Sequence, residues 1–491
     1  MSRREPMSAI DTAWLRTDRS TNPMVIAGLL LTEARVDFER FRRVMETHFL
    51  AHRRFRERVA FDGDSAGWEP DPDFDLSFHV RRAALPRPGG QAELYELVGD
   101  LMSSPLDRAR PLWQFQLVER YGRGSAILAR IHHCYADGVV LMKVLQSITT
   151  DAPRAREPAP SEAERAEAHA DLLAGWFGPL GKAVGNALKI GGGLTSAYFD
   201  ALLHPAHALD YAKRGIDLGA EAARLAIMSA DTPTRFKGAP HGVKRAAWTE
   251  RLPLDEVKAL AHATGCSLND VLMSCAAGAL RRYLLDKGDS VEGVEVRALV
   301  PVDMRAQAEG GPFGNYFGGV FVQLPLGIDN PMERLYELRR RMAELKGSVE
   351  PLFTLGLMAA VGLGPRALQQ EVIDLLASRC SLVLTNVPGP QHPLYIAGRR
   401  LREIVFWVPQ SGAIGLGISV LSYDGGVQCG VVADKSLVED PGAIARRFRS
   451  EFEQLLLITL MGSWDGPPDP EEAATLLEEK GPGSEKGPGS N

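Results

Sequence analysis

Two adjacent histidines, an aspartate and a glycine stand at fixed offsets between His132 and Gly138, in the pattern HHxxxDG. A neutral imidazole accepts a proton near pH 7, and an alcohol must lose a proton as it becomes a nucleophile. A chance match to four fixed residue types in a chain of this length is on the order of one in a thousand. The pattern therefore predicts a general-base site. Its structural alternative is a core histidine pair with ordinary hydrogen bonds.

The flanking segments predict how this stretch is positioned. Residues 126–131 form a short apolar run, typical of a buried strand, and residues 141–148 carry apolar side chains at helical spacing. The motif thus lies at a strand-to-helix junction. There Gly138 allows a close backbone turn, and Asp137 can hold the turn or cap the helix. Since neighbouring strand residues point to opposite faces, only one of the two histidines can easily face a cleft.

Two other chemistries could use the same residues. Cys134 beside His133 could form a thiolate nucleophile with a histidine partner, but adjacent side chains on a strand diverge. His133 and Asp137 are also spaced like a pair of metal ligands, yet no third ligand cluster lies nearby in the sequence. The sequence therefore favours base catalysis without a metal.

Several further fragments could contribute to a site, and each has a structural reading as well. A proline and a tryptophan at a strand start are typical of core packing, and an asparagine–aspartate pair in a first helical turn suits the helix dipole. An arginine at a strand end can simply be solvated, and an asparagine in a rigid loop after a strand fits either reading. These candidates are Pro111, Trp113, Asn269, Asp270, Arg305 and Asn386.

Composition limits the class of protein. With 491 residues the chain is too long for one ordinary core, and 45% apolar and 24% charged residues are typical of a soluble globular protein. A net charge of -6 without a basic stripe argues against nucleic acid as a partner. The five scattered cysteines form no C-x-x-C pair, so we expect neither a zinc site nor a disulfide framework. Free cysteines fit a protein of the reducing cytosol. We also expect no secretory signal and no spanning helix.

The order of predicted elements divides the chain into four parts. Strands and helices are mixed in two lobes, residues 1–150 and residues 240–465. A linker and a helical connection lie between them at residues 151–239, and a disordered tail follows at residues 466–491. Within the connection, residues 172–228 are either helices packed on the body or an interfacial segment that rests on lipid. Strands are predicted at 76–80, 112–118, 126–131, 296–302, 319–324, 382–384, 404–407, 414–421 and 427–432. Helices are predicted at 93–102, 254–264, 268–285 (with Ser267 as N-cap) and 448–460.

Taken together, these fragments resemble the bacterial wax ester synthase/acyl-CoA:diacylglycerol acyltransferase family. The resemblance covers roughly residues 6–465 by the order of its fragments. The HHxxxDG pattern alone also occurs in peptide-synthetase condensation domains and related CoA-dependent acyltransferases, and the other fragments narrow the match. The fragments are residues 6–15, 22–24, 74–76 with 79–80, 111–113, 132–138, 267–270, 301–305 and 385–390.

The resemblance implies an α/β, two-lobed chloramphenicol-acetyltransferase-like fold with mixed sheets, helices and a substrate tunnel between the lobes. It assigns the base to His133 and a mainly structural role to Asp137, which we expect to pair with Arg305. The implied substrates are long-chain acyl-CoA and a fatty alcohol or diacylglycerol, giving wax esters or triacylglycerol. Acyl-CoA is a co-substrate, and no cofactor is expected. We expect a cytoplasmic protein associated peripherally with membrane or lipid inclusions, and Asn269 is the expected oxyanion donor.

Two other functions remain open at this stage. A condensation-type transferase would use a carrier-bound acyl group, and turnover with free acyl-CoA separates the two. A non-catalytic lipid-surface protein would bind lipid and form no ester, against which the intact motif speaks. For the transferase we expect direct transfer without an acyl-enzyme, because Cys134 diverges from His133 and no G-x-S-x-G signature is present.

Overall fold

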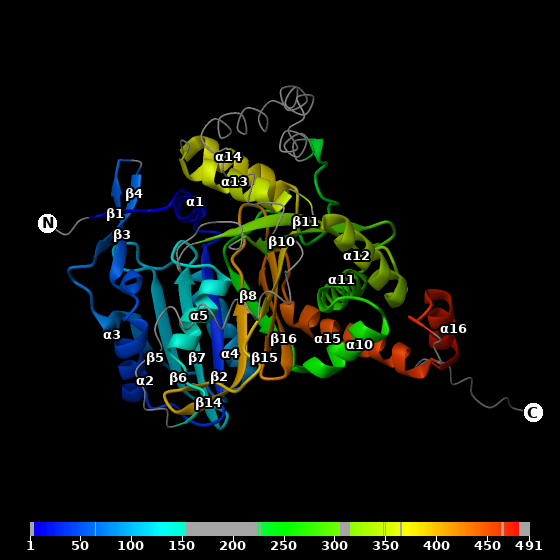
Figure 1. Ribbon diagram of the computed structural model, residues 1–491, viewed down its shortest axis with the longest axis horizontal. Helices are drawn as coiled ribbons and strands as arrows, with labels where there is room; N and C mark the ends of the chain where they lie inside the picture. Colours follow the sequence, from blue (N-terminus) through cyan, green and yellow to red (C-terminus); the bar gives the residue numbers. More distant parts are fainter. Residues whose placement is uncertain are drawn as a thin grey trace, which may run out of the picture.

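The chain forms two lobes, each built around a mixed β-sheet with helices on its faces, as a computed structural model shows (Figure 1). The structure describes residues 4–480 apart from 64, 154–223, 225–226, 305–314, 347, 349, 364–365 and 463–465. Parallel and antiparallel pairs occur in both large sheets, which confirms the predicted mixed α/β class.

The sheet of the first lobe is buried on both faces. Its strands, in order across the sheet, are β13 (Tyr395–Ile396), β14 (Arg399–Trp407), β2 (Val25–Thr32), β7 (Gly124–His132), β6 (Trp113–Tyr121) and β5 (Val80–Ala83). Its flanking helices are α4 (Gln91–Ser103) and α5 (Gly138–Ser147). Leu30 and Ile127 belong to the hydrophobic cluster that includes α5, whereas Leu29 and Leu128 belong to the one that includes α4. This alternation follows from the opposite directions of successive strand side chains.

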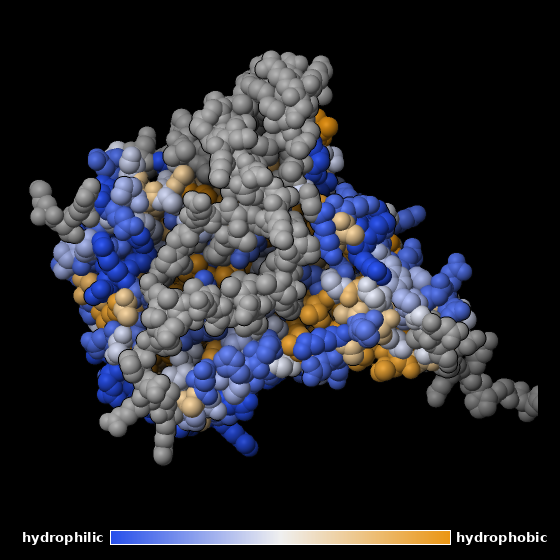
Figure 2. Space-filling view, viewed as in Figure 1, coloured by the Kyte–Doolittle hydropathy of each residue, from blue (hydrophilic) through white to orange (hydrophobic). Residues whose placement is uncertain are grey.

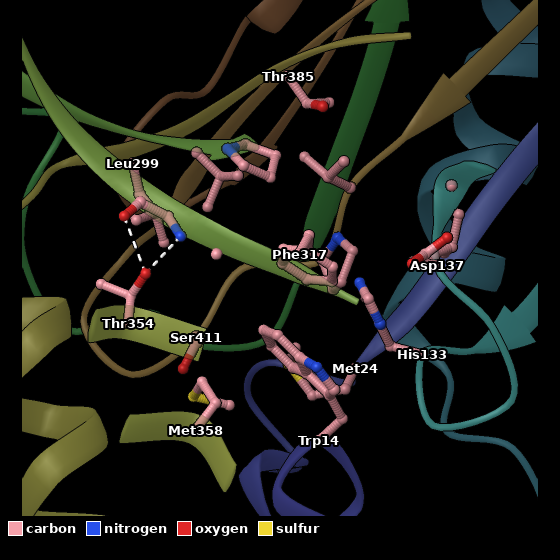
Figure 3. A pocket seen from close by; sticks show the side chains of 18 of the residues that line it. Trp14, Met24, His133, Asp137, Leu299, Phe317, Thr354, Met358, Thr385 and Ser411 are labelled. Carbon is pink, nitrogen blue, oxygen red and sulfur yellow. Dashed lines mark hydrogen bonds between the residues drawn. The ribbon is translucent and has the colours of Figure 1, made fainter. Parts of the chain in front are cut away.

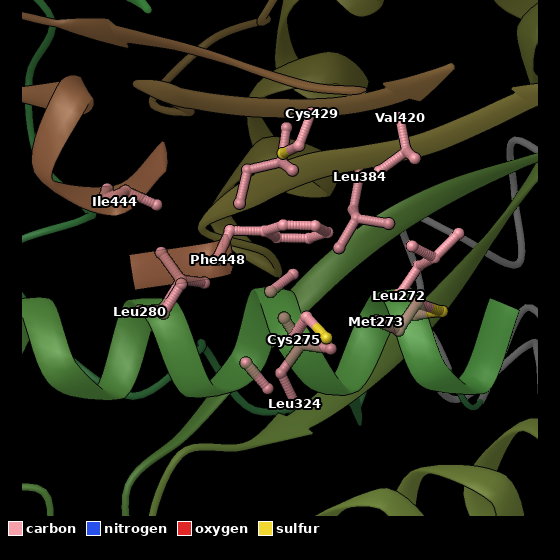
Figure 4. Close-up of a cluster of buried hydrophobic side chains, with 14 of the residues drawn as sticks. Leu272, Met273, Cys275, Leu280, Leu324, Leu384, Val420, Cys429, Ile444 and Phe448 are labelled. Carbon is pink, nitrogen blue, oxygen red and sulfur yellow. The ribbon is translucent and has the colours of Figure 1, made fainter. Parts of the chain in front are cut away.

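The sheet of the second lobe has helices against both faces as well. Its strands are β11 (Phe317–Pro325), β10 (Glu295–Asp303), β12 (Leu382–Pro388), β15 (Leu416–Tyr423), β16 (Gly426–Asp434) and β8 (Lys244–Trp248), with β9 (Leu252–Pro253) also paired to β16. Its helices are α10 (Leu254–Ala263), α11 (Leu268–Asp286), α12 (Pro331–Leu345), α13 (Glu350–Leu363), α14 (Arg366–Ser378) and α15 (Pro441–Met461). Figure 4 shows Cys275 and Leu280 of α11 with Phe448 of α15 under the strand side chains. The predicted N-cap is confirmed, since the Ser267 hydroxyl accepts a hydrogen bond from the Asp270 amide.

Smaller elements lie around the two large sheets. A three-stranded sheet contains β1 (Glu5–Pro6), β4 (Ser65–Pro70) and β3 (Glu57–Asp62). The remaining helices are α1 (Ala9–Thr17), α2 (Phe38–Val44), η1 (Met45–Phe49), η2 (Arg53–Arg56), α3 (Leu76–His79) and α16 (Pro470–Lys480). Among them, α1 matters most for the site, because it packs against α13 and so joins the amino terminus to the second lobe.

Two strands of the first sheet, β13 and β14, come from the second half of the chain. β14 pairs antiparallel with β2 and places Phe406 opposite Gly28. The predicted lobe of residues 240–465 therefore also supplies strands to the sheet of the first lobe. After β12 the chain crosses into the first sheet and then returns with β15. The crossing strand covers the edge of β2, which would otherwise present unpaired backbone groups.

The predicted strand at 76–80 is wrong for its first four residues, which form α3. The Asp75 carboxylate accepts a hydrogen bond from the Ser77 amide at 2.8 Å and so caps this short helix. Only Val80 enters β5, which pairs in parallel with β6. Local capping therefore outweighs the apolar pattern of the segment.

The predicted disordered tail of residues 466–491 is wrong for residues 470–480, which form α16. Ala473 is fully buried, and the hydroxyl of Tyr336 donates a hydrogen bond to the Pro468 carbonyl at 2.7 Å. The packing of α16 against α12 and α15 provides the stabilisation that its polar sequence does not suggest.

Two predictions concern residues outside the described part of the chain. The lipid-facing alternative for residues 172–228 falls almost wholly on undescribed positions. The predicted Asp137–Arg305 pair cannot be located, because Arg305 lies outside the described residues. Within the described ranges, none of the helices combines the length and apolar character needed to cross a membrane.

Candidate active site

The HHxxxDG stretch leaves β7 and enters α5, which confirms the predicted strand-to-helix junction. The His133 amide donates to the Met24 carbonyl at 2.7 Å, which ties the turn to the start of β2. The Tyr135 amide donates to the His132 carbonyl at 3.0 Å and closes the turn. The backbone around the two histidines is therefore fixed before any side chain is considered.

His133 lies buried at one end of a cavity between the lobes, with 8% of its surface exposed. Its ring stacks on Trp14, with centroids 4.5 Å apart and planes 21° apart, and Phe317 of the second lobe lies 5.5 Å away. Figure 3 shows the three rings together at this end of the cavity, with Asp137 beside them. Two aromatic neighbours therefore hold the imidazole from either lobe.

Burial determines the charge of His133. Desolvation, only partly opposed by the nearby carboxylate of Asp137, lowers the pKa of His133 to about 4. Its Nδ1 is buried and makes no hydrogen bond to any described residue. The imidazole is therefore neutral at pH 7 and can accept a proton.

The cavity beside His133 is large and mostly apolar. Its empty space, counted out to the open mouth, is about 1610 Å³. It is lined from both lobes, by α1, β2 and the motif on one side and by β10, β11, β12, α13 and α14 on the other. Polar side chains on its wall are few: Thr17, Asp137, Asp303, Thr354, Thr385, Asn386 and Ser411. Such a lining suits a long apolar ligand with a small number of polar atoms.

The outer surface around this region contrasts with the cavity. Figure 2 shows hydrophilic residues over the margins of one face and apolar residues between them toward the middle of the molecule.

Within the described ranges, no group of three or more His, Cys, Asp or Glu side chains could hold a metal ion. The absence of a metal requirement stays a prediction.

Two family models match this chain: the wax ester synthase/diacylglycerol acyltransferase catalytic domain over residues 7–272, and the WS/DGAT C-terminal domain over residues 313–456. The chain belongs to the wax ester synthase/diacylglycerol acyltransferase family. It is 27% identical over 476 residues to the probable diacylglycerol O-acyltransferase tgs1 of Mycobacterium tuberculosis, covering 92% of this chain and 96% of the relative. A second M. tuberculosis protein, also named a diacylglycerol O-acyltransferase, is 30% identical over 428 residues, 80% of this chain and 87% of that protein. The chain is thus an acyltransferase.

Solved structures show the same fold. The wax ester synthase/diacylglycerol acyltransferase from Marinobacter aquaeolei matches with a TM-score of 0.65 at 21% identity, covering 92% of this chain and 99% of that one. The first condensation domain of the calcium-dependent antibiotic synthetase matches with a TM-score of 0.58 at 14% identity, covering 93% and 96%. These matches confirm the predicted two-lobed chloramphenicol-acetyltransferase-like fold.

The first histidine of the motif, His132, does not line the cavity. His132 accepts a hydrogen bond at Nδ1 from the Cys134 amide at 3.1 Å, and its Nε2 lies 3.7 Å from the Asp18 carboxylate. Although burial opposes it, the contact with His132 helps to lower the pKa of Asp18 to about 2. His132 therefore supports the turn and does not line the cavity.

Cys134 also points into the core. Only 1% of its surface is exposed, and it lies in the hydrophobic cluster of the first lobe. Burial raises the pKa of its thiol well above the ordinary value. A neutral thiol outside the cavity cannot serve as the nucleophile of the rival mechanism, as strand alternation predicts.

Asp137 and Gly138 begin α5. The Asp137 carboxylate accepts hydrogen bonds from the amides of Val139 at 3.1 Å and Val140 at 3.0 Å, so it is the N-cap. Gly138 has no left-handed backbone, and a Cβ there would make an ordinary contact with Val387 at 3.7 Å. The sequence predicts that Gly138 allows a close backbone turn, but neither its backbone angles nor the space around it require a glycine. Its missing side chain instead leaves space in the cavity wall.

Asn315 of the second lobe is a site residue that sequence reasoning missed. Its Nδ2 donates to the main-chain oxygen of His133 at 2.9 Å and to Asp11 Oδ1 at 2.7 Å. Burial raises the pKa of Asp11, so this carboxyl depends on the amide of Asn315. Trp14 was missed too, although both Asp11 and Trp14 belong to the opening segment that resembles the family.

Three candidates from the sequence have structural roles away from the cavity. Trp113 is fully buried, donates its indole N–H to the Phe55 carbonyl at 2.8 Å and stacks on His79. Pro111 accepts a hydrogen bond from the Trp113 amide at 2.9 Å. Asp270 closes a capping box by accepting from the Ser267 amide at 2.7 Å. None of the three lines the cavity.

Asn386 lines the cavity, whereas Asn269 does not. Asn386 donates through Nδ2 to Asn269 Oδ1 at 2.6 Å, so Asn269 orients Asn386. The predicted loop at 385–390 starts later than expected, because β12 continues to Pro388 in parallel pairing with β15. The position of Asn269 therefore gives no support to its expected contact with the oxyanion.

Proposed function

We propose that this acyltransferase moves a long-chain acyl group from acyl-CoA to a fatty alcohol or diacylglycerol, with His133 as the general base. The observation that carries the proposal is an imidazole stacked on Trp14 at the wall of a large apolar cavity, and its burial lowers the pKa of His133. The names of the relatives point to diacylglycerol as an acceptor. No cofactor is required beyond acyl-CoA as co-substrate.

The proton balance of the reaction fits one histidine. His133 takes the hydroxyl proton as the alcohol oxygen forms a bond to the thioester carbonyl carbon. The carbon–sulfur bond then breaks, and the imidazolium returns its proton to the departing thiolate. The products are one ester and one free CoA thiol, and the histidine ends neutral, as it began.

Direct transfer is the proposed path. The neighbouring thiol of Cys134 is buried and outside the cavity, so it cannot take the acyl group first. A ternary complex holds both substrates beside the base before the thioester breaks, which supplies the orientation that the reaction needs. An apolar cavity also limits hydrolysis of the thioester by water.

We further propose that the enzyme meets its substrates at a membrane or lipid-inclusion surface, because both the acceptor and the acyl chain are poorly soluble in water. Residues 172–228 are the proposed contact, from their aromatic and leucine content. Polar substitutions at Trp176, Phe177, Tyr198 and Phe199 should reduce cosedimentation with liposomes. Unchanged cosedimentation would show that the segment packs on the protein.

The proposed activity is tested with purified protein, palmitoyl-CoA and either hexadecanol or a diacylglycerol. We expect one free thiol released for each ester formed, with the ester identified by mass spectrometry. The matched control omits the acceptor and should release little thiol. Ester formation only with a carrier-bound acyl donor would contradict the acyl-CoA assignment, and lipid binding without any ester would contradict catalysis.

A further inference from the structure

A second chamber adjoins the cavity of His133. Its empty space, counted out to its opening, is about 700 Å³, and it lies between the first sheet and α5, with Val387 and Leu421 of the second sheet also in its wall. The two spaces share Ile26, Gly138, Val387 and Phe406 in their walls. None of the side chains that line the second chamber is polar or charged. The two spaces are therefore neighbours, separated at most by these shared side chains.

The hollow originates in two small residues on neighbouring strands. Gly28 of β2 and Ala129 of β7 are paired in register, and both face α5. Both keep accessible surface although they occupy the middle of central strands. A Cβ added at Gly28 would meet only the Val405 carbonyl oxygen, at 4.0 Å. The sheet thus has a depression where larger neighbours on the same face, Ile26 and Leu30, would otherwise continue the core.

Protein cores are normally packed without such voids, because each unfilled apolar cavity costs stability. A chamber lined only by apolar side chains offers no side-chain partner to an ester, a hydroxyl or a phosphate. It suits a run of methylene groups, which gain free energy from leaving water. The main cavity differs, since Asp303, Thr385 and Asn386 are on its wall.

We propose that the chamber behind α5 holds the distal part of the acyl chain that is transferred, and that Gly28 and Ala129 set its length limit. This inference rests on the proposed function. The acceptor, which in a diacylglycerol carries two esters and a hydroxyl, occupies the main cavity with its polar wall. The acyl chain, which has only methylenes beyond its thioester, enters the chamber past Gly138.

Filling the chamber should shorten the preferred acyl donor. Gly28→Val places a β-branched side chain on a strand, where such residues are well tolerated, and fills space that displaces two or three methylenes. We expect the ratio of kcat/KM for palmitoyl-CoA over octanoyl-CoA to fall by on the order of tenfold or more. Gly28→Ala should give a smaller shift in the same direction. The length preference for the alcohol should not change.

Enlarging the chamber supplies the opposite test. Leu145 lines it from α5 and is only half-buried, so Leu145→Ala should favour donors longer than palmitoyl-CoA and should partly restore the Gly28→Val enzyme. The control is Gly356→Ala on α13, where an added Cβ meets no atom within 4 Å and which lines neither space. It should leave the donor profile unchanged.

A binding measurement separates the subsite from the reaction. Calorimetry with palmityl-CoA and octyl-CoA thioethers, which cannot react, should show Gly28→Val weakening the long analogue selectively. An unchanged donor profile and unchanged thioether binding in Gly28→Val would overturn the proposal, and so would a shift confined to alcohol length. Failure of the proposed function would give a different result. The wild-type enzyme would then form no ester with any acyl-CoA donor, whether or not it binds the thioethers.

Discussion

The two adjacent histidines of the motif lie on opposite sides of the turn, and their surroundings differ. On the cavity side, His133 stacks on Trp14 and has a pKa lowered to about 4 by burial. On the core side, His132 lies against Asp18 and Cys134, and these residues do not line the cavity. Two adjacent residues of the same type therefore have different surroundings. His132 ends β7 and lies in the core, whereas His133, the first residue of the turn, lies at the cavity wall.

The surroundings of each histidine, and not its residue type, therefore determine whether it serves catalysis or stability. His132 accepts a hydrogen bond from the Cys134 amide and lies 3.7 Å from the Asp18 carboxylate, so its contacts are with the protein. His133 stacks on Trp14 at the wall of the cavity, where a substrate can reach it. Substitutions on the two sides should therefore separate turnover from stability.

The largest effect is expected at His133. His133→Gln should lower kcat by about 10²–10⁴-fold, the range that a general base contributes, while the melting temperature changes little. Steady-state thiol release and differential scanning calorimetry measure the two quantities. Turnover within about threefold of wild type would mean that another group is the base.

A smaller loss is expected at Asn315, which positions His133 from the second lobe. Asn315→Ala removes the donor to the His133 main-chain oxygen and should lower kcat by about 10–100-fold with little change in KM, as misplacement of a catalytic group does. Asn330→Ala, which removes an N-cap asparagine far from His133, is the control for a loss of stability alone. Equal effects of the two variants on kcat would exclude a positioning role.

On the core side, His132→Ala should cost mainly stability. It removes the acceptor for the Cys134 amide and a partner of Asp18, so we expect a loss of about 1–3 kcal/mol in the free energy of unfolding. The decrease in kcat should stay below that of Asn315→Ala. The pKa of Asp18, now about 2, should rise in this variant, which carbonyl NMR can follow. A loss of turnover equal to that of His133→Gln would contradict the division between the two sides.

The smallest effect is expected at Cys134. Cys134→Ala removes one buried sulfur and should keep turnover within about twofold of wild type. Intact-mass analysis after acyl-CoA alone should show no acylated enzyme in either protein. An acyl adduct on the wild type that is absent from Cys134→Ala would replace direct transfer by a covalent mechanism.

Most elements and the motif junction could be predicted from the sequence, because they depend on neighbours in the chain. Periodicity located β7 and α5, and the capping serine located the start of α11. The errors at α3 and α16 came from local capping and from packing between distant helices.

The rest of the site depends on contacts between residues far apart in the sequence. Asn315 reaches His133 across 182 positions and Asp11 across 304, and no local pattern marks it. The depression at Gly28 and Ala129 requires the register of two strands, about a hundred residues apart, that the sequence alone does not specify. The crossing of β14 into the first sheet has the same origin.

The pH dependence of kcat/KM tests most directly whether the buried, neutral His133 is the base, because it reports groups of the free enzyme. Burial also makes the free energy of unfolding fall as pH decreases from the ordinary histidine value of 6.5 toward 4, so circular dichroism must confirm the fold at each pH. We predict that activity is level from pH 7 to below pH 6 and is lost with an acid limb near pH 4. A limb at pH 6.5 or above, or the same limb in His133→Gln, would contradict the account.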